Sequence, residues 1–204
     1  MSPKLIEGAY TQLLRDPHLG SLVRLVGKAQ IGNRRDVFHS LCRSIIYQQL
    51  SGKAAGSIHT RFCALFPKKI PKAKKLLRIQ TEKLRGAGLS NQKVIYLRDL
   101  AEKYLEGVID PKRFPKMSDE EIITHLVAVK GIGVWTVHMF LIFTLGRPDV
   151  LPTGDLGVRK GFQRVFGMRQ LPKPARMEKL AKAWRPYRSI ASWYLWKAVD
   201  GGGI

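Results

Sequence analysis

Asp155 is the residue of this chain whose type and position are best suited to chemistry. It follows the short loop at residues 151–154 and precedes a segment of helical periodicity at 156–167. A carboxylate at the start of a helix can stabilise a positive charge that develops during a reaction, and it can orient or deprotonate a water molecule. By residue type alone, Asp155 would most often serve only as the cap of the following helix. Other motifs must therefore decide between these two roles.

The segment at residues 127–136 joins two helical patterns through the turn Gly131-Ile132-Gly133. Glycine permits a positive φ and the close approach of another backbone. Amides exposed at the start of the second helix can then donate to a phosphate, and the helix dipole favours the negative charge there. Ile132 would anchor the turn in the core. A Gly-x-Gly turn on its own is more often a plain joint between helices, so its context matters.

The composition of the chain favours a polyanionic partner. Its 204 residues include 36 Lys and Arg against 15 Asp and Glu, which gives a formal net charge of +21. Nucleic acid is the leading partner for such an excess, and the alternative is a basic protein whose charge only prevents self-association. A hydrophobic content of 45% supports a packed globule, and the length suffices for one large domain or two small lobes.

The two cysteines, Cys42 and Cys63, argue against a disulfide scaffold and against a cysteine-ligated metal or iron–sulfur site. We expect both to be buried free thiols. The first ten residues contain no apolar core of signal-peptide length. The longest apolar stretch, residues 134–145, is too short to span a bilayer and is typical of a buried helix. The sequence therefore predicts an intracellular protein without a membrane segment.

Glycines, prolines and capping residues divide the chain into helical patterns, and no strand alternation persists for more than a few residues. Asp36 and Ser51 can each cap a helix, and Ser118 with Glu121 fits a capping box. The expected helices cover residues 36–49, 51–67, about 94–104, 118–130, 134–145, 155–167 and 187–199. The sequence therefore predicts an all-α fold.

Four segments of the chain carry motifs in a fixed order: residues 45–55, residues 84–90, the hairpin followed by residues 149–156, and residues 193–197. Together they resemble the helix-hairpin-helix DNA glycosylase superfamily, and within it the branch of 3-methyladenine DNA glycosylase II. The resemblance covers about residues 20–198. It implies a two-lobed helical fold with the active-site cleft between the lobes. A central lobe would span about 36–150 and a second lobe 1–35 plus 151–204, the whole being a single catalytic unit.

The resemblance implies that Asp155 is the catalytic carboxylate, because it occupies the family's position in Asp-Val-Leu-Pro-x-x-Asp-Leu. The implied reaction hydrolyses the N-glycosidic bond of alkylated purines, of the 3-methyladenine and 7-methylguanine type, in duplex DNA during base excision repair. Positive charge develops on the deoxyribose as that bond breaks, and a carboxylate stabilises it. No cofactor is expected for catalysis. Many relatives have two adjacent aspartates, whereas Gly154 precedes Asp155 here, which places the helix cap in question.

The position of Trp135 favours monofunctional cleavage. Relatives that also cut the strand place a lysine two residues after the second hairpin glycine, where its amine forms a Schiff base with the sugar. Trp135 occupies that position, and Lys130 and Lys160 do not. Two alternatives stay open. One is a bifunctional glycosylase and AP lyase, and the other is a non-enzymatic helix-hairpin-helix DNA-binding protein, which would need the turn but neither Asp155 nor an aromatic pocket.

The resemblance also implies an aromatic pocket for the flipped base. A base inside a duplex must be flipped out before its glycosidic bond is accessible, and aromatic faces attract the positive charge of an alkylated purine. Trp135 and Trp196 match pocket positions of the family and could sandwich the base. Trp193 and Tyr47 are weaker candidates. Tryptophans on helices can instead belong to the core, and that is the interpretation we favour for Trp184 and Trp193.

Three segments are expected to contact DNA. The corner Gln48-Gln49-Leu50-Ser51 resembles the loop that fills the gap left by the flipped nucleotide, with Leu50 or Ser51 as the wedge; the alternative is a solvated helix end. The hairpin is expected to contact DNA through Lys130, Gly131, Ile132 and Gly133. The corner of residues 84–89, with Gly86 and Gly88, and the nearby Lys93 would grip phosphates of the other strand.

The resemblance further implies a structural Na⁺ or K⁺ ion at the hairpin, held by the main-chain carbonyls of Val127, Val129 and Ile132. Side chains leave no trace of such a site. The expected partner is double-stranded DNA containing alkylated bases, with no membrane, and the expected state is a monomer. The expected location is with the DNA, in the nucleus of a eukaryote or the cytoplasm and nucleoid of a prokaryote.

Overall fold

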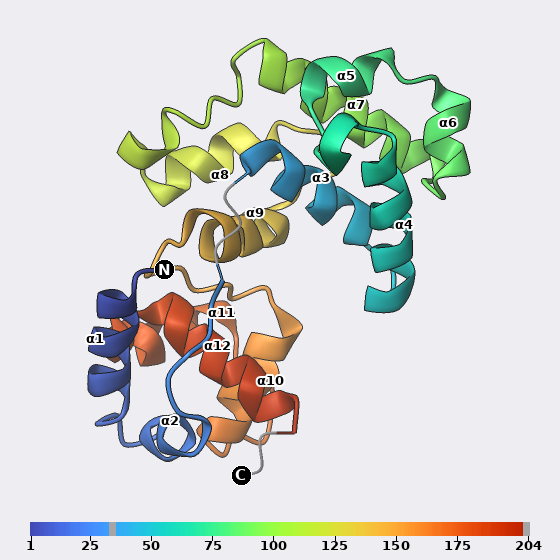
Figure 1. The fold of residues 1–204 in the computed structure, drawn as a ribbon. Helices are drawn as coiled ribbons and strands as arrows, with labels where there is room; N and C mark the ends of the chain where they lie inside the picture. Colours follow the sequence, from blue (N-terminus) through green and yellow to red (C-terminus); the bar gives the residue numbers. More distant parts are fainter. Residues whose placement is uncertain (33–35, 202–204) are drawn as a thin grey trace. The chain divides into compact units, whose positions relative to one another are not determined.

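The computed structural model describes residues 1–32 and 36–201, which form helices joined by turns and contain no strand (Figure 1). The all-α prediction is confirmed. The α-helices are α1 (Pro3–Leu13), α2 (Gly20–Val26), α3 (Val37–Tyr47), α4 (Gly52–Ala64), α5 (Ala73–Arg78), α6 (Thr81–Gly86), α7 (Asn91–Leu105), α8 (Asp119–Val127), α9 (Val134–Phe140), α10 (Leu156–Val165), α11 (Pro174–Leu180) and α12 (Arg188–Val199). Short turns of 3-10 helix lie at Pro67–Lys69, Phe114–Lys116 and Ala181–Trp184, and a π-helical turn at Leu141–Leu145.

The chain divides into two compact units, which are described separately. Residues 34–140 form what we call the central unit, and residues 1–33 with 141–204 form the terminal unit. The predicted lobe boundary between residues 35 and 36 falls next to residues 33–35, which lie outside the described part of the chain. Residues 141–150, predicted as part of the central lobe, pack here with the terminal unit. The functional lobes themselves stay a prediction.

The core of the terminal unit is built around α10 and α12, which pack closely against each other. Gly161 on α10 makes this approach possible, because a Cβ there would lie 2.5 Å from the carbonyl oxygen of Leu195 on α12. Phe162, Trp184 and Tyr194 fill the space around the two helices and are almost fully buried. This confirms the interpretation of Trp184 as a core residue. The packing also holds the start of α10 against α12.

In the central unit, α3 packs against α4, α7 and α9. The apolar side chains Phe38, Leu41 and Ile45 lie on the buried side of α3 and are at most 2% exposed. α8 and α9 follow one another as the two helices of the hairpin, and they also pack together. Burial of the α3 stripe thus brings the corner at its end close to the hairpin, and both features belong to the predicted DNA-binding segments.

Local capping signals set several helix starts as predicted. The side chains of Asp36 and Ser51 cap α3 and α4. Ser118 and Glu121 form the expected capping box, in which the Ser118 N–H donates to Glu121 Oε2 at 2.7 Å and the Glu121 N–H to Ser118 Oγ at 3.2 Å. The predicted helix at residues 134–145 is instead α9 followed by the π-helical turn. Within the described residues, no helix has the length and apolar character to cross a membrane.

Candidate active site

Asp155 lies at the N-terminus of α10 and is 9% exposed. Its Oδ1 accepts a hydrogen bond from the backbone N–H of Val158 at 2.8 Å, so it caps α10 directly. The same oxygen accepts a second hydrogen bond from the indole N–H of Trp196, also at 2.8 Å. The carboxylate is therefore fixed by two donors at the positive end of a helix dipole. The presence of Gly154 before it leaves the helix cap intact, because Asp155 supplies the cap itself.

Trp196 lies half-buried on α12. The ring of Phe143 stacks on it, with centroids 5.7 Å apart and an interplanar angle of 30°. Gly157, in the first turn of α10, lies next to the Cδ1–Nε1 edge of the ring. A Cβ at Gly157 would be 2.8 Å from Trp196 Cδ1 and 3.1 Å from Asp155 Oδ1. The absence of a side chain at Gly157 therefore lets the indole reach the carboxylate, a role that the sequence did not indicate.

The loop that precedes Asp155 is tied to the start of α12 by a second carboxylate, Asp149. Arg188 donates to Asp149 Oδ1 from Nε at 2.7 Å and to Oδ2 from Nη2 at 3.0 Å, and Arg185 adds a contact of 2.9 Å to Oδ2. Ser189 reinforces the tie, since its Oγ accepts from the Val150 N–H at 2.9 Å. Asp149 and Asp155 are thus both attached to α12, one at each end of the same loop.

In the hairpin of the central unit, the two glycines differ in what they do. Gly131 has a φ of +78°, and a Cβ there would overlap the ring of Tyr96, so both its conformation and its packing require glycine. Gly133 has no positive φ, and a Cβ there would meet nothing within 4 Å. Ile132 between them is 4% exposed, which confirms that it anchors the turn. Gly133 therefore leaves open space at the start of α9, and the phosphate contact expected there stays a prediction.

Asp99 on α7 holds the hairpin in place. Its Oδ2 accepts from the backbone N–H of Lys130 at 2.9 Å, and its Oδ1 accepts from Lys103 Nζ at 2.6 Å. Burial raises the pKa of Asp99, but the hydrogen bonds from Lys103 and Lys130 and the charges of both lysines outweigh it, so the pKa is lowered overall. The sequence did not point to Asp99, because its hairpin partner is 31 residues away.

The corner of residues 48–51 is attached to the hairpin. Gln48 Nε2 donates to the carbonyl oxygen of Gly131 at 2.7 Å. Lys93 stabilises the corner at the C-terminal end of α3, because its Nζ donates to the carbonyls of Ile46 at 2.7 Å and Gln48 at 2.9 Å. Burial lowers the pKa of Lys93. The structure thus engages Lys93 with backbone carbonyls, and its predicted phosphate contact depends on the third N–H of the ammonium group.

The tip of the corner presents Leu50 rather than Ser51. Gln49 has a left-handed φ of +56°, which turns the chain sharply between α3 and α4. Leu50 follows with 40% of its surface exposed, so it is not a core residue. Ser51 caps α4, and its Oγ accepts from the Ala54 N–H at 3.4 Å. Of the two predicted wedge residues, Leu50 is the one whose side chain has no capping role.

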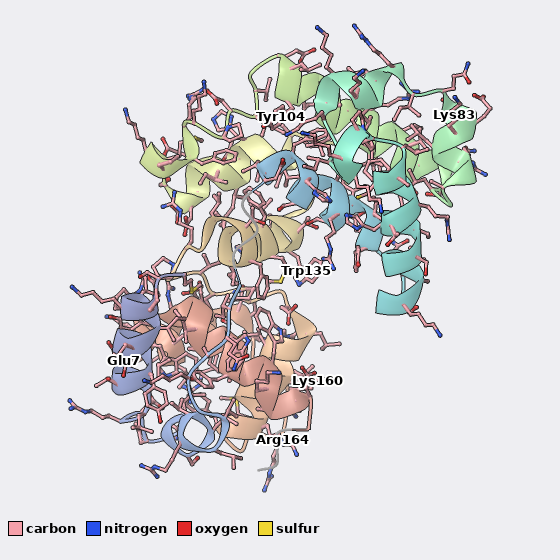
Figure 2. The ribbon with its side chains drawn as sticks, in the orientation of Figure 1. Glu7, Lys83, Tyr104, Trp135, Lys160 and Arg164 are labelled. Carbon is pink, nitrogen blue, oxygen red and sulfur yellow. The ribbon has the colours of Figure 1, made fainter. Side chains whose placement is uncertain are left out.

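The other three aromatic residues predicted for the base pocket, Trp135, Tyr47 and Trp193, differ in burial and in their neighbours. Trp135 lies on α9 in the central unit and is 49% exposed (Figure 2). Tyr47 is half-buried at the end of α3, with the guanidinium of Arg43 over its ring, 3.7 Å from the centroid. Trp193 packs against the core of the terminal unit. The predicted sandwich of a base by Trp135 and Trp196, and the weaker roles of Tyr47 and Trp193, stay predictions.

The corner at residues 84–89 contains two glycines in different settings. Gly88 has a φ of +98°, and a Cβ there would lie 2.8 Å from Nη2 of Arg61. The Arg61 side chain is held in this position because its Nε donates to the Ala87 carbonyl at 3.0 Å. Gly86 is exposed, and a Cβ there would meet nothing within 4 Å. The phosphate contacts expected at Gly86 and Gly88 stay predictions.

Comparison with known families assigns the chain. Residues 42–186 match the family described as HhH-GPD superfamily base excision DNA repair protein, a span that includes the corner, the hairpin and Asp155. The chain belongs to this family. HhH-GPD membership agrees with the all-α fold and with the hairpin between α8 and α9.

Individual HhH-GPD relatives cover most of the chain. DNA-3-methyladenine glycosylase 1 of Schizosaccharomyces pombe is 34% identical over 89% of this chain and 82% of the relative. A solved structure of the S. pombe 3-methyladenine DNA glycosylase in complex with abasic DNA aligns with a TM-score of 0.86 at 32% identity, over 97% of this chain and 99% of the other. A crystal structure of DNA-3-methyladenine glycosidase from Bacillus halodurans gives a TM-score of 0.86 at 35% identity, over 98% and 90%.

Proposed function

We propose that this chain is a monofunctional DNA glycosylase that hydrolyses the N-glycosidic bond of alkylated purines in duplex DNA, of the 3-methyladenine and 7-methylguanine type. The observation that carries the proposal is the buried Asp155 carboxylate, fixed by the Val158 and Trp196 N–H groups at the start of α10. The names of the relatives support the same class of substrate. Such an enzyme works on cellular DNA during base excision repair.

Asp155 would act electrostatically on the sugar. As the purine departs, positive charge develops on the deoxyribose, and a fixed carboxylate stabilises it without reorganising. Asp155 can also orient or deprotonate the attacking water. Fixed charges and dipoles of this kind are commonly worth about 100-fold to 1,000-fold in rate each. An alkylated purine already has a weakened glycosidic bond, so little activation of the leaving group is needed.

Aromatic residues would select the base. An alkylated purine is cationic, and the faces of tryptophan rings attract cations. Trp196 is the best placed, because its ring is fixed by Phe143 and Asp155 next to the reacting carboxylate. Trp135 offers a further exposed ring, and Trp193 and Tyr47 are secondary candidates. A flipped base in contact with Trp196 would bring its sugar close to Asp155.

The hairpin and the corner would bind the DNA backbone. The open space at Gly133 lets a phosphate approach the amides at the start of α9, where the helix dipole favours negative charge. Lys130 is an exposed cation in the same turn. The hydrogen bond from Gln48 to Gly131 links the corner to this phosphate site, so the two segments are positioned together. The net charge of +21 supports binding without sequence preference.

A structural monovalent cation at the hairpin is part of the proposal. Val127 is the last residue of α8. Carbonyls at a helix C-terminus lack partners within the helix and form the negative end of its dipole, which favours a cation. Val129 accepts from the Ile132 N–H at 3.0 Å, which leaves a second lone pair on its oxygen. With Ile132, these carbonyls would supply the oxygen donors that Na⁺ or K⁺ prefers. The ion would stiffen the turn and take no part in bond cleavage.

One experiment tests the proposed function. The protein is incubated with an alkylated duplex, and released bases and strand breaks are measured separately, with and without borohydride. We expect free 3-methyladenine or 7-methylguanine, an abasic strand that breaks only after alkali, and no trapped complex. A borohydride-trapped complex with matching nicks would show the bifunctional enzyme instead. DNA binding without release of any base would show the non-enzymatic DNA-binding protein.

A further inference from the structure

A cluster of nitrogen and sulfur donors lies in the central unit, where α3 and α4 pack side by side (Figure 1). His39 is in the first turn of α3. His59 and Cys63 are four residues apart on α4 and therefore share one face of that helix. Among the described residues, these three form the single group of three or more His, Cys, Asp or Glu side chains whose donor atoms all lie within 4.8 Å of one another.

The distances between the three donors are those of an assembled metal site. The Nε2 atoms of His39 and His59 are 3.0 Å apart, and Cys63 Sγ lies 3.4 Å from the first and 3.6 Å from the second. Zinc bonds of about 2.0 Å to nitrogen and about 2.3 Å to sulfur in a tetrahedron place two nitrogens about 3.4 Å apart and a nitrogen and a sulfur about 3.6 Å apart. The observed triangle is within a few tenths of an ångström of this geometry.

Linear hydrogen bonds among the three side chains account for only part of this convergence. Each nitrogen of a neutral imidazole carries either one proton or one lone pair in the ring plane. His39 Nε2 nevertheless has two neighbours at short range, His59 Nε2 and Cys63 Sγ, and it can make a linear hydrogen bond with one of them at a time. A metal ion at the centre of the triangle would instead use one lone pair from each donor at once.

We propose that His39, His59 and Cys63 bind one zinc ion, with a water molecule as the fourth ligand. Two imidazole nitrogens and a thiolate suit a borderline-soft divalent ion such as Zn²⁺. Binding converts the Cys63 thiol to a thiolate and releases its proton to solvent. The Cys63 side chain is buried and both histidines are half-buried, so the ion has a protein side and a side open to water.

A zinc ion at this site would connect the two helices that flank the corner of residues 48–51. α3 ends and α4 begins at residues 48–51, so a zinc ion between His39 on α3 and the α4 pair closes a loop around the corner. The Tyr47 ring stands edge-on to the His59 ring, with centroids 6.1 Å apart, and helps to orient this ligand. The ion would hold the two helices that flank the corner together, and it stands apart from the chemistry of Asp155. It also departs from the expectation, based on having only two cysteines, that no cysteine binds a metal.

The test uses the full chain without a histidine tag, stripped with a chelator and then titrated with Zn²⁺ in a calorimeter. We expect one zinc per chain, and a melting temperature that rises with zinc, because an ion that binds only the folded state stabilises it. Cys63→Ala and His59→Gln should lose both effects. Cys42→Ala, at the other buried thiol, and His125→Gln on α8 are matched controls that should keep them.

Cobalt provides a readout that depends on the thiolate itself. Co²⁺ added to the stripped wild-type protein should give a thiolate-to-metal charge-transfer band, and this band should be absent from Cys63→Ala. The cobalt spectrum is read on the wild type, so it stays informative if a variant folds poorly. A wild-type chain that binds no zinc, or zinc bound equally by Cys63→Ala and His59→Gln, would overturn the proposal.

Discussion

The indole N–H of Trp196 donates a 2.8 Å hydrogen bond to Oδ1 of Asp155, the same oxygen that caps α10. The aromatic residue assigned to the base is therefore attached to the carboxylate assigned to the sugar. A base and the sugar that carries it are neighbours in the substrate, so this connection is what a glycosylase site needs. Gly157 makes the contact possible, because a side chain there would collide with the indole.

We expect Asp155→Asn to lower the single-turnover rate of excision by about 100-fold or more, because it removes the negative charge that stabilises the sugar. Asparagine is as good a helix cap as aspartate, so α10 should stay intact. The thermal midpoint and the affinity for undamaged DNA should therefore match those of the wild type. A near-normal single-turnover rate would show that another group carries the chemistry.

Trp196→Phe separates the two roles of Trp196, because phenylalanine keeps an aromatic face but cannot donate to Asp155. A hydrogen bond to a charged group is worth about 1.5 to 3 kcal/mol, so we expect kcat to fall about tenfold or more while KM changes little. Tyr194→Phe, which also removes one hydrogen bond made from α12 but at a distance from Asp155 in the fold, is the matched control and should leave kcat unchanged. Equal effects of the two substitutions would mean that the indole N–H does not position the carboxylate.

Features set by neighbouring residues could be predicted from the sequence, and features set by helix packing could not. Asp36 and the capping box of Ser118 and Glu121 predicted the starts of α3 and α8, because a cap and its partner lie within one turn of each other. Asp155 could be singled out as the candidate catalytic residue because it belongs to a motif with fixed spacing. Asp99 with Lys130 and Asp149 with Arg188 are 31 and 39 residues apart, and their pairing depends on how α7 and α12 pack.

The same limit applies to the histidine cluster and to Lys93. His39 and His59 are 20 residues apart on two helices, and no local pattern shows that their rings meet. Lys93 was predicted, with the corner at residues 84–89, to contact phosphates of the other strand. Tertiary packing brings its ammonium group to the carbonyls of Ile46 and Gln48 at the end of α3, a contact that no local pattern predicts. The phosphate contact stays a prediction.

Substitutions of the two hairpin glycines should have different effects. Gly133→Leu should fold normally, because the space around this position is open, but the added side chain should block the phosphate and weaken binding to damaged and undamaged DNA alike. Gly131→Ala should lower the free energy of unfolding by about 1 to 3 kcal/mol, because its φ is +78° and Tyr96 fills the space. Thermal melts and binding isotherms distinguish the two; normal DNA binding by Gly133→Leu would place the phosphate elsewhere.

Asp99 should make the stability of the hairpin depend on pH. The pKa of Asp99 is lowered in the folded protein, so its contribution to the free energy of unfolding is full above the unfolded pKa of about 3.9 and is lost as the pH falls through the folded pKa. We expect Asp99→Asn to cost about 1 to 3 kcal/mol at pH 7 and progressively less below about pH 4. Glu102→Gln, an exposed carboxylate on the same helix, is the control. A loss that is the same at pH 3 and pH 7 would show that the charge of Asp99 contributes nothing.

Leu50 tests how the corner holds a base out of the helix. Flipping leaves a hole in the stack, and restacking competes with the flipped state on a scale of a few kcal/mol. Leu50 is 40% exposed at the tip of a sharp turn, so its side chain is free to enter that hole, whereas the Ser51 hydroxyl caps α4.

We therefore expect Leu50→Ala to slow excision from fully paired sites by about tenfold and from mismatched sites by less, because less pairing must be broken at a mismatch. Leu105→Ala, at an exposed leucine at the end of α7, is the matched control and should change neither rate. Single-turnover rates on the two duplexes decide the matter. Because Leu50 is exposed, a general loss of stability is not expected to mimic the effect. An equal loss on both duplexes, or none, would place the wedge at another residue of the corner.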